Sequence, residues 1–172
     1  KQAITVLIKV LEDVQQEPMV RHEAAEALGA IGSPDVLPVL QKYLKDPVVE
    51  VAETCELALD RINWLQDSEC HKEQLTENPY SSVDPAPPAT IQDIAKLKGI
   101  LINDDGGLFQ RYRAMFALRN MRTEEAVLAL SSALKYGSAL FRHEIAFVLG
   151  QLQNEASIPY LKESLEDYSE NE

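Results

Sequence analysis

The sequence predicts an all-α protein, an α-solenoid of helical hairpins in two halves, and three observations lead to this fold class. Apolar residues recur at helical spacing along most of the 172 residues, and no alternating segment carries the turn residues of a β-hairpin. The sequence also matches itself when it is shifted by 121 positions, and a proline-rich stretch separates the two matching parts. We therefore expect residues 1–65 and 91–172 to form the two halves, joined by a spacer at residues 66–90.

Capping residues and apolar spacing predict four helices in the first half. Pro18 can occupy the first turn of a helix, where its missing N–H costs nothing, and Gly32 can end that helix. Ser33, followed by a proline, has the side chain of an N-cap for the next helix. The expected helices are residues 3–14, 18–31, 35–44 and 47–64.

The same signals predict five helices in the second half. The run Asn103 to Gly107 interrupts the apolar pattern, and Thr123 can cap the helix that follows it. Gly137 and Ser138 precede the helix that ends its apolar pattern at Leu149. The expected helices are residues 91–102, 108–121, 124–135 and 155–165, with the helix that bears His143, started by Gly137-Ser138, before the last of them.

A shorter period of 31 residues runs within each half. Residues 20–28 match residues 51–59 at this shift, and Phe116 matches Phe147. Repeated helix hairpins of roughly 30 to 45 residues are typical of α-solenoids of the HEAT or armadillo kind. Because the pattern runs past both ends, we expect the first half to be incomplete at its N-terminus and the second at its C-terminus.

Two His-Glu doublets occupy equivalent points of the 121-residue duplication, His22-Glu23 and His143-Glu144. Packing alone explains conserved small and apolar positions, but it does not explain two adjacent ionisable residues at matched points. Imidazole with carboxylate suits iron, manganese or zinc. Because neighbouring helix residues point about 100° apart, we expect ligands to be pooled from several repeats, with rows from the two halves facing each other around a pair of metals.

The alternative reading of each doublet is a solvated pair on a helix surface, and it stays open. Glu26 lies four residues after His22 and shares its helix face. Its counterpart in the duplication is Phe147, so the repeat does not support Glu26 as a ligand. We interpret it as a solvated carboxylate or as one that lies beside the metal ligands.

Two further pairs of residues recur at the 121-residue shift, and we interpret both pairs as structural. We interpret Arg21 and Arg142 as ion-pair partners of nearby carboxylates rather than as substrate-binding residues. We expect Gly29 and Gly150 to permit close approach of neighbouring helices.

Composition narrows the class of protein and of partner. A formal net charge of −12 argues against nucleic acid as a partner and favours a cationic one. Cys55 and Cys70 offer neither a disulfide framework nor the spacing of a metal-binding pair. No stretch reads as a membrane span or a signal peptide, so we expect no membrane partner and a cytoplasmic location.

Four segments resemble the deoxyhypusine hydroxylases of eukaryotes, and the similarity covers essentially the whole chain. The first segment includes the first doublet, the second lies in the proline-rich stretch, the third precedes the second doublet, and the fourth ends on that doublet. They are residues 18–31, 82–88, 111–119 and 137–144.

This resemblance implies a two-domain HEAT-repeat monooxygenase with four His-Glu motifs around a non-haem di-iron centre, holding two Fe(II) ions per complete protein. It implies hydroxylation by O₂ of the deoxyhypusine residue of translation initiation factor five-A, which yields hypusine. His22 and Glu23 would bind one iron and His143 the other. Glu144 belongs to the motif and is also assigned as catalytic, either beside the metal or directed at the substrate amine. Since only two of four doublets are present, the resemblance implies an inactive isolated chain.

Two other functions remain as alternatives. A HEAT-type protein-binding scaffold without catalysis would keep the doublets for structural reasons. A solenoid lyase that attaches pigments shares short repeats of this kind, but the sequence lacks a suitable constellation of reactive cysteines.

Overall fold

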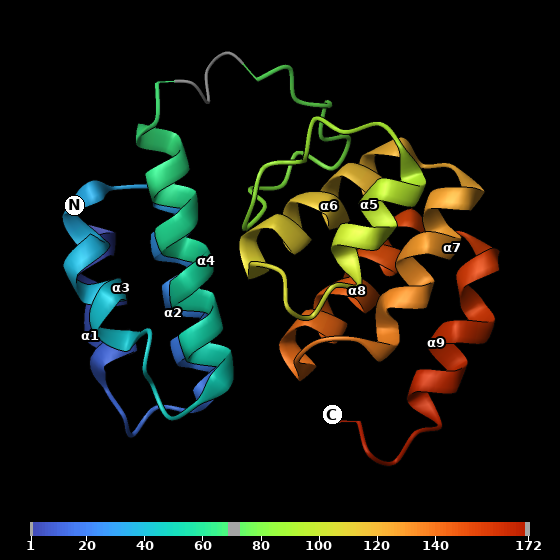
Figure 1. Cartoon of the computed structure of the whole chain (residues 1–172). Helices are drawn as coiled ribbons and strands as arrows, with labels where there is room; N and C mark the ends of the chain where they lie inside the picture. Colours follow the sequence, from blue (N-terminus) through green and yellow to red (C-terminus); the bar gives the residue numbers. More distant parts are fainter. Residues whose placement is uncertain (1, 69–72, 171–172) are drawn as a thin grey trace. The chain divides into compact units, whose positions relative to one another are not determined.

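The computed structural model describes residues 2–68 and 73–170, and in this part of the chain all regular structure is helical (Figure 1). The predicted all-α class is confirmed. The chain divides into two compact units: Lys1–Glu73 with Val83–Ala86 form unit 1, and Gln74–Ser82 with Pro87–Glu172 form unit 2. Along the sequence the chain therefore leaves unit 1 for unit 2, returns to unit 1 at Val83–Ala86, and then stays in unit 2. Cys70 lies outside the described residues.

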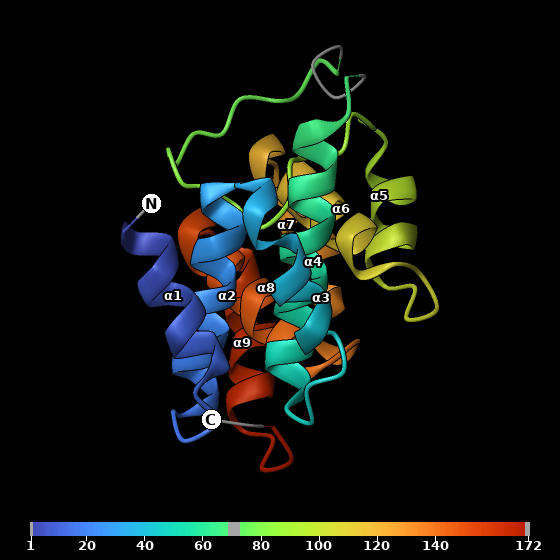
Figure 2. The ribbon, with the colours of Figure 1, turned by 90° about the vertical axis from the view of Figure 1, so that its left-hand side faces the viewer.

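Unit 1 consists of two layers of helices. Helices α1 and α3 form one layer and α2 and α4 the other, as the two views in Figures 1 and 2 show. Helix α2 packs against both α1 and α4, and α3 packs against α4. The helices are α1 (Gln2–Glu12), α2 (Pro18–Ile31), α3 (Leu37–Tyr43, after a 3₁₀ turn at Pro34–Val36) and α4 (Val49–Gln66).

Local signals explain where these helices begin and end. Pro18 occupies the first turn of α2, and Gly32 ends it with a left-handed φ of 72°. The Ser33 hydroxyl accepts the Asp35 N–H at the following 3₁₀ turn. Helix α4 begins two residues later than expected because the Asp46 carboxylate accepts the Val48 N–H just before it.

The core of unit 1 is apolar and draws side chains from all four helices. Leu28 on α2, Leu40 on α3 and Ile62 on α4 are completely buried. Helices α2 and α4 approach each other closely at Gly29, where an added Cβ would lie 2.8 Å from the Cβ of Ala58. The expectation of close helix packing at Gly29 is therefore confirmed.

Unit 2 also consists of short helices that pack against one another. Helix α6 packs against α5, α7 and α8, and α7 also contacts α9. Side chains of Asp93, Thr123 and Ser138 cap α5, α7 and α8. The helices are α5 (Ile94–Leu101), α6 (Leu108–Met121), α7 (Glu124–Ser132, extended by a 3₁₀ turn at Ala133–Lys135), α8 (Ala139–Leu152) and α9 (Ile158–Leu165, after a 3₁₀ turn at Glu155–Ser157).

Gly150 on α8 differs from its counterpart Gly29. A Cβ added to Gly150 would meet nothing within 4 Å, so the expected close approach is wrong at this position. The reason is that no helix within the described residues packs on α8 as α4 packs on α2.

The proline-rich stretch is packed rather than a bare spacer. Ala86 is completely buried in unit 1, and the Arg61 guanidinium donates to the Asp84 carbonyl. In unit 2 the Ala89 N–H donates to the Arg113 carbonyl at 2.9 Å. Each end of this stretch is thus held by the unit to which it belongs.

The recurring arginines support the repeat architecture. Arg21 pairs with Asp46, and Arg142 pairs with Glu170 at 2.7 Å, so their interpretation as ion-pair partners is confirmed. Arg111, which stands one 31-residue period before Arg142, was not recognised in the sequence. Its Nε donates to the carbonyl of Leu101 at the end of the preceding helix. Arg21 makes the same bond to the end of α1.

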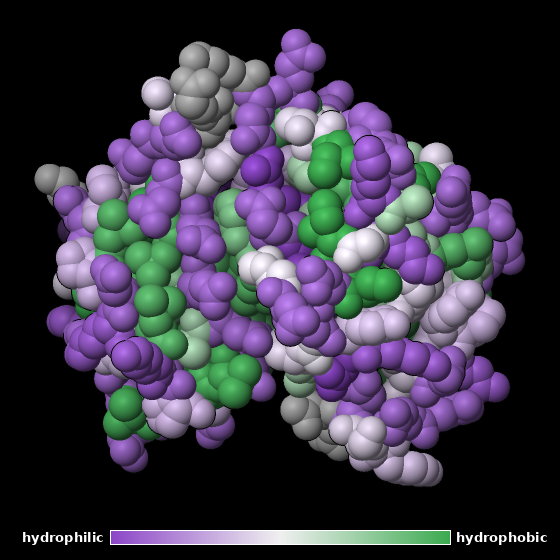
Figure 3. All heavy atoms as spheres, viewed as in Figure 1, coloured by the Kyte–Doolittle hydropathy of each residue, from purple (hydrophilic) through white to green (hydrophobic). Residues whose placement is uncertain are grey.

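On the face shown in Figure 3, hydrophilic side chains cover most of each unit and leave smaller hydrophobic areas between them. None of the described helices combines the length and apolar character needed to cross a bilayer.

Candidate functional site

The first doublet lies on α2, at the surface that α4 partly covers. His22 is only 5% exposed, whereas Glu23, one residue further along the helix, is exposed. The His22 ring reaches across to α4, where its Nδ1 lies 2.6 Å from Oγ1 of Thr54. The Thr54 hydroxyl in turn donates to the Glu50 carbonyl at 2.7 Å. The imidazole is therefore held in one orientation by the neighbouring helix.

Glu26 lies beside the other nitrogen of the same ring. Its Oε2 is 3.7 Å from Nε2 of His22, which is longer than a hydrogen bond, and about one-third of the side chain is exposed. Burial raises the pKa of the Glu26 carboxyl, and the negative charges of Glu23 and Asp84 raise it further. The sequence had already placed Glu26 on the His22 face by its i, i+4 spacing. The structure adds that it is a half-buried neighbour of Nε2.

The second doublet lies on α8 in different surroundings. His143 is exposed and Glu144 is half-buried. Phe147, which stands where Glu26 stands in the first copy, is 56% exposed. The difference follows from packing, because α4 covers the doublet on α2 while the doublet on α8 has no such neighbour within the described residues.

Neither doublet forms a complete metal site within its own unit. Among residues 2–68 and 73–170, no three side chains of His, Cys, Asp or Glu are grouped closely enough to hold a metal ion. Each doublet can therefore contribute some ligands to an ion but not a full set. The four residues assigned from the sequence remain a prediction: His22, Glu23, His143 and Glu144.

Thr54 is the residue of this site that sequence reasoning missed. One signal was present, since Thr54 stands 31 residues after Glu23 and so at the equivalent point of the next repeat. Residues at equivalent points of adjacent solenoid repeats lie side by side. A hydroxyl at that point was therefore a candidate neighbour for the doublet.

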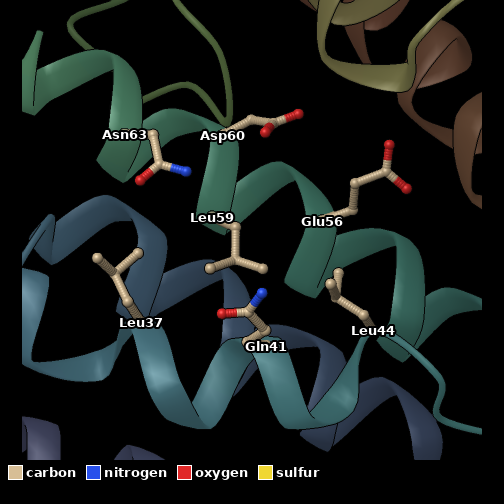
Figure 4. A pocket seen from close by; sticks show the side chains of 7 residues that line it. All are labelled: Leu37, Gln41, Leu44, Glu56, Leu59, Asp60 and Asn63. Carbon is tan, nitrogen blue, oxygen red and sulfur yellow. The ribbon is translucent and has the colours of Figure 1, made fainter.

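A pocket of about 280 Å³ lies between α3 and α4, apart from the doublets (Figure 4). Leu37, Leu44 and Leu59 form its apolar lining, and the carboxylates of Glu56 and Asp60 project from α4. Burial raises the pKa of both carboxyls, and the charge of Asp60 adds to the effect at Glu56. No residue of either doublet lines this pocket.

Residues 1–60 and 94–172 match the family model for HEAT repeats. The chain belongs to the HEAT-repeat family. The predicted solenoid of HEAT-like hairpins is thereby confirmed, and the unmatched segment includes the proline-rich stretch.

This HEAT-repeat chain is similar to deoxyhypusine hydroxylases over nearly its whole length, which confirms the resemblance. It is 62% identical to the deoxyhypusine hydroxylase of Drosophila melanogaster over 172 residues, covering 99% of this chain and 56% of that protein. It is 57% identical to the one from Homo sapiens, covering 98% of this chain and 55% of that protein. The chain thus spans about half the length of these curated relatives.

A solved structure agrees with this similarity. The structure of human deoxyhypusine hydroxylase in complex with glycerol matches with a TM-score of 0.91 and 56% sequence identity. The match covers 99% of this HEAT-repeat chain and 58% of the human one.

Proposed function

We propose that this chain carries half of the metal-binding doublets of a deoxyhypusine hydroxylase. The observation that carries the proposal is the similarity to enzymes of that name at 62% identity over 99% of the chain. The recurrence of a His-Glu doublet at matched points of the duplication supports it independently of the comparison.

The doublets are the residues that we assign to iron. His22 and Glu23 would bind one ferrous ion, and His143 and Glu144 would contribute to the other. The surroundings of His22 fit this role, because its buried imidazole, held by Thr54 on α4, offers a nitrogen donor that suits iron, and the exposed Glu23 beside it in the sequence offers an oxygen donor. When bound, two ferrous ions would supply the activation of O₂ for hydroxylation of a C–H bond.

The remaining residues would bind and orient the substrate. We propose that it is the deoxyhypusine side chain of translation initiation factor five-A, whose amino groups are positively charged. The net charge of −12 favours the approach of such a cation, in keeping with the predicted absence of a nucleic-acid or membrane partner. Glu144, half-buried on α8, would accept a hydrogen bond from the substrate amine or lie against the metal ligands. A cytoplasmic location would suit this substrate.

A scaffold without catalysis is the second candidate function. The exposed position of His143 and the absence of a three-residue ligand group among the described residues favour it. Under this alternative the doublets would be surface residues of a protein-binding solenoid.

Iron content and hydroxylase activity decide between the two functions. In a protein of the relatives' full length that contains this chain, we expect about two iron ions per protein chain. We expect His22→Ala to lose iron and activity, while His71→Ala, which removes a histidine outside the doublets, retains both. Iron retained by a His22→Ala, His143→Ala double variant would exclude the assigned ligands. For this chain alone we expect weak iron binding, because each ion lacks part of its ligand set.

A further inference from the structure

Thr54 and His22 form a buried polar contact at the first doublet. Thr54 and His22 are 3% and 5% exposed as whole residues, so water has little access to either. Their 2.6 Å contact joins α4 to α2. The hydrogen bond from the Thr54 hydroxyl to the Glu50 carbonyl, four residues earlier on α4, holds Oγ1 in place.

The direction of these hydrogen bonds follows from counting protons. A threonine hydroxyl has one proton, and here that proton is donated to the Glu50 carbonyl. Oγ1 can therefore only accept in its contact with the imidazole, which places a proton on Nδ1 of His22. In the neutral ring the lone pair then resides on Nε2, the atom that lies beside Glu26.

We propose that Thr54 is a positioning residue that selects the Nδ1–H tautomer of His22 and directs the Nε2 lone pair toward a bound metal ion. The proposal rests on the proposed function in one respect, that Nε2 is the ligand atom. A histidine that binds metal through one ring nitrogen is commonly oriented by a hydrogen bond from its other N–H. Thr54 supplies the acceptor of that bond from the next repeat of the solenoid.

The proposal accounts for an asymmetry of the repeats. Thr54 stands 31 residues after Glu23, where a further doublet would have its carboxylate. Here the Thr54 side chain instead contacts His22 on α2, the equivalent helix of the preceding repeat. The histidine of the doublet on α2 is thus held by a hydroxyl on α4, the equivalent helix of the next repeat.

The test compares Thr54→Val with Thr54→Ser in metal-free protein. Valine keeps the shape of threonine without the acceptor, and serine keeps the acceptor without the methyl group. The ¹⁵N chemical shifts of the His22 ring, measured at about pH 8.5 where histidine is ordinarily neutral, report which nitrogen is protonated. We expect Nδ1–H in the unaltered chain and in Thr54→Ser, and loss of that single tautomer in Thr54→Val.

Fe(II) affinity gives a second readout. In a protein of the relatives' full length, Thr54→Val should weaken Fe(II) binding by about 10- to 100-fold, and Thr54→Ser should change it far less. A purely structural Thr54 would alter stability without moving the tautomer. If Thr54→Val does not fold, the ring shifts of the unaltered chain still decide, because an Nε2–H or doubly protonated ring would overturn the proposal.

Failure of this inference is distinguishable from failure of the proposed function. An unchanged tautomer in a folded Thr54→Val variant would reject the role of Thr54 whether or not iron binds. An Nδ1–H ring that depends on Thr54, in a full-length protein that takes up no iron, would reject the proposed function and keep the hydrogen-bond assignment.

Discussion

Arg21 and Asp46 form a two-pronged ion pair inside unit 1, with nitrogen–oxygen distances of 2.5 and 3.2 Å and side chains that are 4% and 3% exposed. The same guanidinium donates through Nε to the Leu11 carbonyl at 2.9 Å. The pair thus ties the loop before α4 to α2 and to the end of α1. Its burial makes it the clearest target for stability measurements.

Asp46→Asn should destabilise unit 1 strongly. It leaves the buried Arg21 charge unpaired, which costs about 3 to 5 kcal/mol in comparable cases. Urea denaturation measures the free energy of unfolding. The control is Glu12→Gln, which removes an exposed pair with Lys42 and should destabilise the chain far less. Equal losses in the two variants would show that burial does not govern the pair.

The same pair should make stability fall in acid. Burial by itself would raise the pKa of Asp46, but hydrogen bonds from Arg21 and the Val48 amide, with the charge of Arg21, bring it below its ordinary value of 3.8. A lowered pKa stabilises the fold above the unfolded value, and this stabilisation is lost as pH falls through the folded value. We expect the stability difference between the unaltered chain and Asp46→Asn to shrink below pH 3.8. A difference that stays constant there would contradict the assigned charge.

Asp60→Asn should stabilise the fold at neutral pH, whereas Asp46→Asn should destabilise it. Burial raises the pKa of Asp60 above its ordinary value of 3.8, so the ionised form is disfavoured in the folded state at pH 7. Removing that charge should raise the urea midpoint at neutral pH, and the gain should vanish at a pH below 3.8, where the carboxyl is protonated. Glu77→Gln removes the same charge at an exposed position and is the control for net charge. A gain equal in both variants would point to net charge instead of burial.

Gly29→Ala and Gly150→Ala should change stability in opposite directions although the two glycines are equivalent in the duplication. At Gly29 the new methyl would lie 2.8 Å from the Ala58 Cβ, and relieving that clash should cost about 1 to 3 kcal/mol. At Gly150, inside α8 and without a neighbour within 4 Å, alanine should stabilise by about 0.5 to 1 kcal/mol. Thermal and urea unfolding measure both changes. Destabilisation by both substitutions would mean that Gly150 is also packed against a helix.

Much of the fold was predictable because helix signals are local. The predicted bounds of α2 and α6, residues 18–31 and 108–121, agree with the structure at both ends. Capping residues and apolar spacing act within a few positions of each other, so they can be read without knowing what packs nearby. The ion-pair role of Arg21 was predictable for a related reason, since its recurrence at Arg142 marks a position that the repeat itself requires.

By itself, the sequence determined the all-α class, the repeat periods and the residues of the two doublets. Only the tertiary structure decided that His22 is buried and held by Thr54 while His143 is exposed. The contact between His22 and Thr54 joins residues 32 positions apart on different helices. The physical reason is that a side chain's burial and hydrogen bonding depend on which helix covers it, and equal sequence positions in two repeats can have different neighbours.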